Sequence, residues 1–212
     1  MPVDRPQYPA NLILDGRPCL VVGGGAVALR KLESLLACGA DVTVVAPVLN
    51  PEIEALVGSG RVGGERRPYR RGEAGAYRLV VAATDDPAVN RSVFEDGDAA
   101  GVWVNTADDP ASCSFTLPSV VRRGPIMVTV ATGGHSPAMS AWLGRHVEAE
   151  LGEEYVVLLG LLSEARASIK AEGGSTEGLD WLSALDSNML DLIRAGQINQ
   201  ARERLQACLS SS

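Results

Sequence analysis

A run of three glycines after a short apolar segment constrains this chain more than any other feature. The segment Cys19–Val22 leads directly into Gly23–Gly25, and a helical pattern follows without a break. Gly23, Gly25 and Ala28 fit the spacing G-x-G-x-x-G/A, which is typical of a strand–turn–helix that holds a dinucleotide. Glycine lets the backbone approach a pyrophosphate, and the helix directs free N–H groups at it. The stretch therefore predicts a dinucleotide-binding turn; the alternative is a glycine turn that only packs a helix on a sheet.

The segments around this turn predict an α/β fold with a doubly wound parallel sheet. Nearly continuous apolar runs predict strands that are buried on both faces, and helical patterns separate them. The expected strands are Cys19–Val22, Asp41–Ala46, Arg61–Arg67, Arg78–Thr84 and Val102–Asn105. The expected helices are Ala26–Ala37, Pro51–Gly58 and Asp86–Ala100. A further short strand is expected at Leu12–Leu14, before a turn at Asp15–Gly16.

The pattern changes after about residue 113. Two strands, Ser114–Val121 and Pro125–Ala131, are joined by a short link that contains Gly124, so we expect a β-hairpin. An isolated hairpin is marginally stable in water, and this one must pack on the first domain or on a second copy of the chain. A helix from about Ala138 to Leu151 follows, and the rest of the chain is predicted to be helical.

Composition excludes several classes of function. The net charge of −7 and the low aromatic content argue against a nucleic-acid partner. The four cysteines are far apart and form no C-x-x-C pair, which excludes a disulfide framework and favours the cytoplasm. The apolar runs are too short to span a membrane, and the first residues do not resemble a signal peptide.

Four loops follow the carboxyl ends of predicted parallel strands, where open α/β sheets bind ligands. They are Gly23–Gly25, Ala46–Val48, Thr84–Asp86 and Asn105–Asp109. A strand that holds the adenosine ribose normally ends in Asp or Glu, but the second strand here ends in Ala46-Pro47, so backbone groups or Asn50 would hold the ribose. No arginine follows directly to suit a 2′-phosphate, which favours NAD over NADP.

Two adjacent carboxylates and two histidines are the remaining candidates for chemistry. Asp108 and Asp109 could transfer protons in an apolar cleft; alternatively they are solvated or cap the next turn. His135, in a glycine-flanked loop, could contact a ligand. With only His135 and His146 and no clustered partners, we expect no resident metal site.

The order of the motifs resembles one known family. The sequences VVGGGAVALRK, GADVTVVAP, LVVAATDDPAVN, VNTADDPASCSFTLPSVV and PIMVTVATGGHSPAMSAWL follow one another over residues 8 to 150. Together they resemble precorrin-2 dehydrogenase, the NAD-dependent enzyme of sirohaem synthesis, which occurs alone or as the N-terminal part of multifunctional sirohaem synthases. The resemblance implies a Rossmann-like NAD-binding domain at 1–113, a β-hairpin and helix dimerisation region at 114–150, and an α-helical C-terminal domain at 151–212.

The resemblance implies that a homodimer oxidises precorrin-2 to sirohydrochlorin with NAD⁺ as hydride acceptor. Some members also insert Fe²⁺, so a bifunctional dehydrogenase and ferrochelatase is one alternative, and a non-catalytic NAD-sensing dimer is another. With 212 residues there is no room for the methyltransferase domain of the multifunctional synthases. We therefore expect another protein to supply precorrin-2.

The resemblance also assigns site residues. Asp108 matches the key aspartate of the family, which is implicated in chelation and is a candidate base in the oxidation. Contacts to the cofactor are expected at the glycine turn and the two following loops, namely Gly23, Gly25, Ala26, Val27, Pro47, Val48 and Thr84. Contacts to the substrate are expected at Asn105, Thr132, His135 and Ser136.

Overall fold

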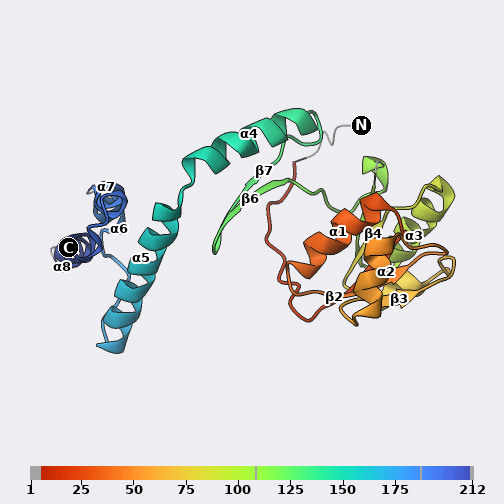
Figure 1. The fold of residues 1–212 in the computed structure, drawn as a ribbon, viewed down its shortest axis with the longest axis horizontal. Coiled ribbons are helices and arrows are strands. Elements are labelled where there is room, and N and C mark those ends of the chain that lie inside the picture. Colours follow the sequence, from red (N-terminus) through yellow and green to blue (C-terminus); the bar gives the residue numbers. More distant parts are fainter. Residues whose placement is uncertain (1–5, 108, 187, 211–212) are drawn as a thin grey trace. The chain divides into compact units, whose positions relative to one another are not determined.

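The structure is a computed structural model, and it describes residues 6–107, 109–186 and 188–210. The chain divides into two compact units (Figure 1): the first runs to Leu117 and includes residues 132–136, and the second contains residues 118–131 and 137–212. A parallel sheet of five strands in the order β3-β2-β1-β4-β5 lies at the centre of the first unit. The strands are β1 (Pro18–Val22), β2 (Asp41–Val45), β3 (Gly63–Glu65), β4 (Leu79–Ala82) and β5 (Trp103–Thr106). This arrangement confirms the predicted Rossmann-like sheet.

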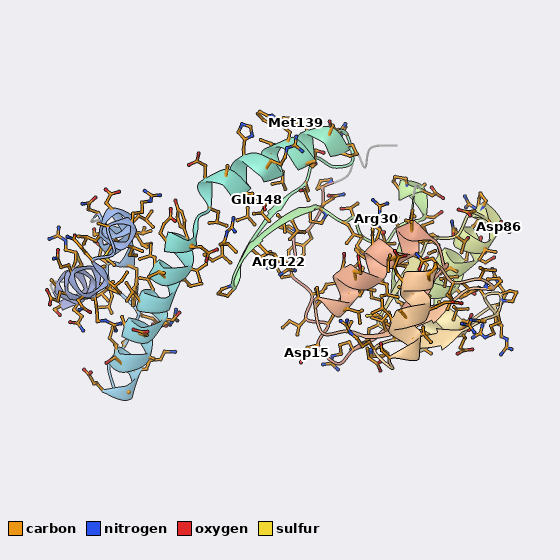
Figure 2. All side chains as sticks on the ribbon, viewed as in Figure 1. Asp15, Arg30, Asp86, Arg122, Met139 and Glu148 are labelled. Carbon is orange, nitrogen blue, oxygen red and sulfur yellow. The ribbon has the colours of Figure 1, made fainter. Side chains whose placement is uncertain are left out.

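Helices connect the strands and cover the sheet. They are α1 (Ala26–Leu36), α2 (Pro51–Gly58) and α3 (Pro87–Ala99), with the short 3-10 turns η1 (Glu73–Ala76) and η2 (Pro110–Ser112). Asp86, labelled in Figure 2, caps α3 by accepting a hydrogen bond from the Ala88 N–H at 2.8 Å. A proline at the first helical position suits both α2 and α3, because that N–H has no partner within a helix.

Successive side chains of β1 enter two different hydrophobic cores, one on each face of the sheet. Val21 packs in a cluster with Leu32 of α1, whereas Leu20 and Val22 pack in a second cluster with Val93 of α3. Each of these side chains is at most 2% exposed. A strand buried on both faces needs an unbroken apolar run, which explains the sequence of β1.

The second unit contains a hairpin and a series of helices. The antiparallel strands β6 (Ser119–Arg123) and β7 (Ile126–Val130) pair over their full length and pack on helix α4 (Pro137–Glu150). Gly144 of α4 lies so close to Ser119 that a larger side chain would displace the hydroxyl. The remaining helices are α5 (Glu153–Ala171), α6 (Trp181–Asp186), α7 (Met189–Arg194) and α8 (Ile198–Ser210).

The last four helices share a core of their own. Leu158 of α5 packs in a cluster with Met189 of α7 and Leu205 of α8, all nearly inaccessible to solvent. The side chain of Arg194 on α7 reaches Glu154 on α5, with Nη2 and Oε1 2.8 Å apart. These four helices confirm that the last part of the chain is helical, as predicted.

Three predicted strands differ from the structure. The strand predicted over 61–67 is shorter and covers only Gly63–Glu65. Leu12–Leu14 is not a strand, because β1 already pairs with β2 on one side and β4 on the other and offers no free edge. The strand predicted to begin at Ser114 begins only at Ser119. The Ser114 N–H donates instead to the Val104 carbonyl at 2.8 Å, so this stretch is held against β5.

Candidate dinucleotide site

A pocket of the first unit lies at the carboxyl ends of β1, β2 and β4 and has a volume of about 790 Å³. Three of the four predicted loops meet there, and the fourth contributes Ala107. The lining residues include Gly23, Gly24, Gly25, Ala26, Val27, Ala46, Pro47, Val48, Asn50, Pro68, Tyr69, Thr84, Asp85 and Asp86. All seven residues predicted to contact the cofactor therefore surround one cavity, as the topology of parallel strands requires.

Two glycines of the first turn are required by close contact with neighbouring backbone. Gly23 has φ +128°, and a Cβ there would collide with the carbonyl group of Ala83 at the end of β4. A Cβ on Gly24 would collide with the carbonyl group of Val48. The Gly23 N–H also donates to the Val45 carbonyl at 2.9 Å. These two glycines therefore hold the ends of β1, β2 and β4 close together.

Gly25 has a different role, because a Cβ added to it would meet no protein atom within 4 Å. It is the N-cap of α1 and supplies no side-chain hydrogen bond, and the first turn of the helix contains no acidic residue. The first N–H groups of α1 and the positive end of its dipole therefore face an open cradle. A pyrophosphate fits such a cradle, both in space and in charge.

The loop after β2 presents an apolar surface to the pocket. Pro47 and the largely exposed side chain of Val48 line it, and no carboxylate ends β2. Asn50 also lines the pocket, but its Oδ1 accepts a hydrogen bond from the Ile53 N–H at 2.8 Å. Asn50 is thus the N-cap of α2.

The position of Thr84 depends on Asn90 of α3, which sequence reasoning did not single out. Asn90 is 8% exposed. Its Oδ1 accepts hydrogen bonds from the N–H and the hydroxyl of Thr84 at 3.1 and 2.8 Å, and its Nδ2 donates to the Thr84 carbonyl at 2.9 Å. The only signal in the sequence was the Asn itself, one turn into the helix after the Thr-Asp-Asp loop.

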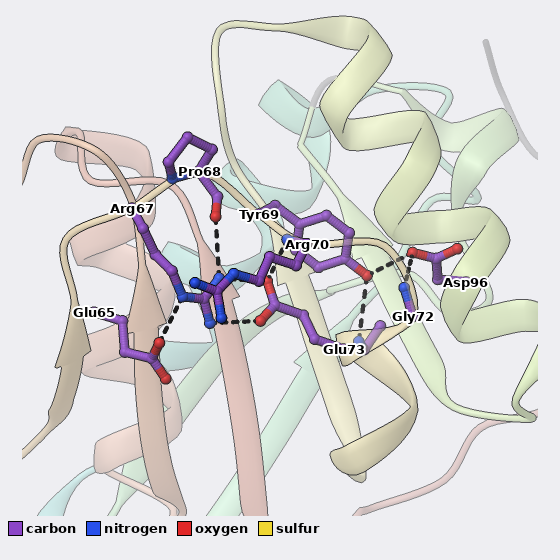
Figure 3. A network of polar contacts seen from close by, with 9 residues as sticks. Glu65, Arg67, Pro68, Tyr69, Arg70, Gly72, Glu73 and Asp96 are labelled. Carbon is purple, nitrogen blue, oxygen red and sulfur yellow. Dashed lines mark hydrogen bonds and ion pairs between the residues drawn. The ribbon is translucent and has the colours of Figure 1, made fainter.

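The segment between β3 and η1 forms a further wall of the pocket, which the sequence pattern did not predict (Figure 3). Pro68 and Tyr69 line the pocket. The Tyr69 hydroxyl donates to Asp96 Oδ2 at 2.9 Å and accepts from the Ala74 N–H at 3.2 Å. Burial, together with the hydrogen bond to Asp96, raises the pKa of Tyr69. The tyrosine is therefore neutral and fixed in place, and nothing in the sequence pattern indicated its proximity to the glycine turn.

The fourth loop contains the predicted catalytic residue, Asp108, which lies outside the described residues. Its neighbour Asp109 caps η2, with Oδ1 accepting from the Ala111 N–H at 3.2 Å. Asn105 is buried, and its Nδ2 donates to the Phe115 carbonyl at 3.1 Å and contacts the Cys113 sulfur. The side chain of Asn105 thus holds the segment after η2, and it is not among the groups lining the pocket.

The other predicted substrate contacts lie together in one loop of the first unit. The Thr132 hydroxyl donates to the Ser136 carbonyl at 3.1 Å and accepts from the Ser136 N–H at 3.3 Å. The His135 N–H donates to the Thr132 carbonyl at 3.0 Å. These contacts fold the loop on itself, and none of the three residues lines the pocket described above.

Among the described residues, no group of three or more His, Cys, Asp or Glu side chains is arranged to hold a metal ion. Within the same part of the chain, every helix is too short or too polar to cross a bilayer.

The parallel sheet, the glycine turn and the open helix N-terminus define a dinucleotide-binding domain of the Rossmann type. In agreement, residues 10–119 match the family model described as "Putative NAD(P)-binding". The chain belongs to this NAD(P)-binding family.

Comparison with curated proteins extends the similarity beyond that domain. The chain is 36% identical to the sirohaem synthase of Nitrosococcus oceani and 37% identical to that of Thioalkalivibrio sulfidiphilus, each over 206 residues and 96% of this chain. It spans 44% and 42% of the length of these two relatives, which is less than half of each.

A solved structure resembles the chain over nearly its whole length. It is SirC, a precorrin-2 dehydrogenase, with a TM-score of 0.69 and 27% sequence identity. The similarity covers 97% of this chain and 98% of SirC.

Proposed function

We propose that this protein catalyses the NAD⁺-dependent oxidation of precorrin-2 to sirohydrochlorin. The end-to-end similarity to the precorrin-2 dehydrogenase SirC is the observation that carries this proposal. A Rossmann-type sheet alone would not specify a reaction, because many activities share it. The similarity to SirC continues through the hairpin and the C-terminal helices, which no generic dinucleotide-binding domain requires.

In the proposed reaction precorrin-2 loses one hydride and one proton, and bound NAD⁺ supplies the hydride acceptor. The N-terminus of α1 and the Gly25 cradle would hold the pyrophosphate. Pro47, Val48 and Thr84 would bound the nucleotide on either side. We propose Asp108 as the base that takes the proton, a role supported by its match to the family motif and by the need for a carboxylate near the macrocycle.

We propose that the hairpin and α4 form the dimerisation region. This region is the middle part of the proposed division of the chain into residues 1–113, 114–150 and 151–212. Apolar side chains on these elements are exposed to solvent, including Val120 of β6 and Trp142 of α4, at 46% and 48%. Figure 2 shows Met139, also exposed, on the same helix. A second copy of the chain that covered these side chains would remove their apolar area from water. We propose that the homodimer works in the cytoplasm, without membrane or nucleic acid.

Incubation of the protein with precorrin-2 and NAD⁺, followed by absorbance of NADH and of the tetrapyrrole, tests the activity. One NADH per sirohydrochlorin is expected, and Asp108→Asn should lower kcat by about 100-fold or more while the Kd for NAD⁺ stays unchanged. Absence of NADH formation by the native chain would overturn the proposal. A parallel reaction with Fe²⁺ or Co²⁺ shows whether the same protein also inserts metal.

Dimer formation is tested by light scattering after size exclusion. The native chain should have the mass of two copies, and Val120→Asp should shift it toward one. Leu182→Asp on α6 changes another exposed apolar side chain in the same way and should leave the mass unchanged. A native protein with the mass of one copy would contradict the dimer.

A further inference from the structure

The end of β3 provides charged groups beside the end of β2, where the usual acidic residue is missing. Val45 of β2 pairs with Glu65 of β3, and the Ala46 N–H donates to the Glu65 carbonyl at 3.2 Å. In Rossmann-type sites the adenosine ribose lies near the end of the second strand. Residues that follow β3 are therefore placed next to the expected position of the ribose.

Glu65, Arg67 and Glu73 form a closed cluster of charges, which we call the carboxylate–arginine triad (Figure 3). Arg67 Nε donates to Glu65 Oε2 at 2.6 Å. Its Nη1 and Nη2 donate to the two carboxylate oxygens of Glu73 at 3.0 and 2.6 Å, a bidentate pair. The side chains of Arg67 and Glu73 are each only 18% exposed. Each nitrogen of the guanidinium thus donates to a protein oxygen, and the triad carries a net charge of about −1 at neutral pH.

The triad is connected directly to the wall of the pocket. Arg67 Nη1 also donates to the carbonyl of Pro68, which lines the pocket with Tyr69. Glu73 Oε1 accepts from the Arg70 N–H at 2.7 Å, which holds the other end of the same segment. A change in the charge of the triad therefore acts close to the pocket, because Pro68 lines the pocket and directly follows Arg67.

The ion pair persists at neutral pH. Burial would raise the pKa of the Glu73 carboxyl, but hydrogen bonds from Arg67 and from the Arg70 amide outweigh it and hold the pKa below its ordinary value. Hydrogen bonds to Glu73 and Glu65 raise the pKa of Arg67. Glu73 thus stays ionised under the conditions in which the enzyme would work.

Two of the neighbouring arginines, Arg66 and Arg71, have acidic partners as well. Arg66 Nη2 lies 2.9 Å from a carboxylate oxygen of Glu54. Arg71 Nη1 lies 3.2 Å from Glu95 Oε2, and its Nε lies 3.3 Å from an oxygen of Asp96. The segment is rich in arginine, but these two side chains pair with the protein's own carboxylates.

From this geometry we infer that the carboxylate–arginine triad makes the pocket select NAD over NADP. This inference rests on the proposed dinucleotide site. A 2′-phosphate carries close to two negative charges and needs a cation with unused donors. Here it would meet a net negative cluster whose arginine already donates to two carboxylates. NAD has only a hydroxyl at that position and experiences no such repulsion.

The test compares kcat/KM for NADP⁺ with kcat/KM for NAD⁺, each with precorrin-2 as substrate. Glu65→Gln/Glu73→Gln removes both negative charges, keeps acceptor oxygens for Arg67 and should raise the NADP⁺/NAD⁺ ratio by about ten-fold or more. Adding Arg67→Gln to that variant leaves the cluster uncharged and should bring the ratio to a value between those of the native chain and the double variant. Glu95→Gln removes the partner of an exposed arginine and should change the ratio by less than about two-fold.

A second measurement needs no variant. If the electrostatic potential near the ribose is negative, added salt should lower the Kd for NADP⁺ relative to the Kd for NAD⁺, because screening weakens the repulsion. The inference would be overturned if the double variant and Glu95→Gln had equal NADP⁺/NAD⁺ ratios of kcat/KM. It would also be overturned if added salt weakened the binding of NADP⁺ to the native chain relative to that of NAD⁺. A native chain that reduced neither cofactor with precorrin-2 would instead contradict the proposed function, whereas the salt dependence of the two Kd values would still test the triad.

Discussion

At the scale of single residues, the three glycines of the first turn act for two different reasons. Gly23 and Gly24 are fixed by protein atoms, because a Cβ on either would collide with a neighbouring carbonyl group. Gly25 is free of such contacts, and its φ of −89° is open to any residue. We therefore propose that the absence of a side chain at Gly25 serves a ligand, whereas at the other two positions it serves the fold.

This difference predicts contrasting variants. Gly25→Ala should lower stability by less than about 1 kcal/mol, since only the N-cap preference changes. It should weaken NAD⁺ binding by about ten-fold or more, because its methyl group would occupy the cradle for the phosphates. Gly23→Ala should instead lower stability by about 1–3 kcal/mol, because of its positive φ and the Ala83 carbonyl. Calorimetric titration and thermal unfolding of both proteins give these quantities; equal NAD⁺ affinity for Gly25→Ala and the native chain would refute the assignment.

At the scale of elements, the connections between strands and helices form the pocket walls. The β4–α3 connection is held by the buried side-chain amide of Asn90, and the β3–η1 connection by the carboxylate–arginine triad. Both use side chains that are distant in sequence from the glycine turn. The strands place these connections at one edge of the sheet, and the side-chain contacts then set their conformation.

The first prediction at this scale concerns Asn90. Asn90→Asp preserves shape but replaces the Nδ2 donor, so the Thr84 carbonyl would face a carboxylate. We expect a loss of about 1–3 kcal/mol in stability and a several-fold higher Kd for NAD⁺. Arg91→Gln, on the exposed side chain that follows Asn90, should change both quantities little. An unaltered Kd in Asn90→Asp would show that the amide matters to the fold alone.

The second prediction concerns pH and Glu73. The folded-state pKa of Glu73 lies below its ordinary value of 4.5, so the unfolded chain binds more protons as the pH falls through that range. The stabilisation by Glu73 should be fully present above about pH 5 and decline as the pH falls toward and below the folded-state pKa. Relative to Glu73→Gln, the native chain should be more stable by about 1–3 kcal/mol at pH 7. Urea unfolding of both proteins from pH 7 to pH 3 measures the difference, which should shrink on acidification.

At the scale of the whole molecule, the two units have separate hydrophobic cores. The sheet of the first unit has a core on each face, and the C-terminal helices share a third core of their own. The dinucleotide pocket is lined entirely by residues of the first unit. Cofactor binding should therefore act directly on one unit.

Hydrogen exchange checks this expectation. Saturating NAD⁺ should slow exchange in the segments that line the pocket, which are 23–27, 46–50, 68–69 and 83–86. At 100 times Kd, binding should also stabilise the first unit by about 2.7 kcal/mol. The core of α5, α7 and α8 should show little change in the absence of substrate. Protection that was confined to those helices would contradict the location of the site.

The sequence by itself determined the parallel sheet, the glycine turn and the helices of the first unit. These elements follow from local patterns: apolar runs for buried strands, Asp86-Pro87 for a helix start, and glycine where no Cβ fits. It also predicted the seven cofactor contacts, and the structure groups these residues around one pocket, although their contact with NAD remains a prediction. The role of Asp108 remains a prediction too.

Only the tertiary structure decided which distant side chains support the pocket. Asn90, Tyr69 and the triad lie far from the glycine turn in sequence, and their partners depend on which strands are neighbours. The same cause explains why Leu12–Leu14 is not a strand, because both edges of β1 are already occupied. Local pattern specifies an element, but the order of strands in the sheet specifies what that element can contact.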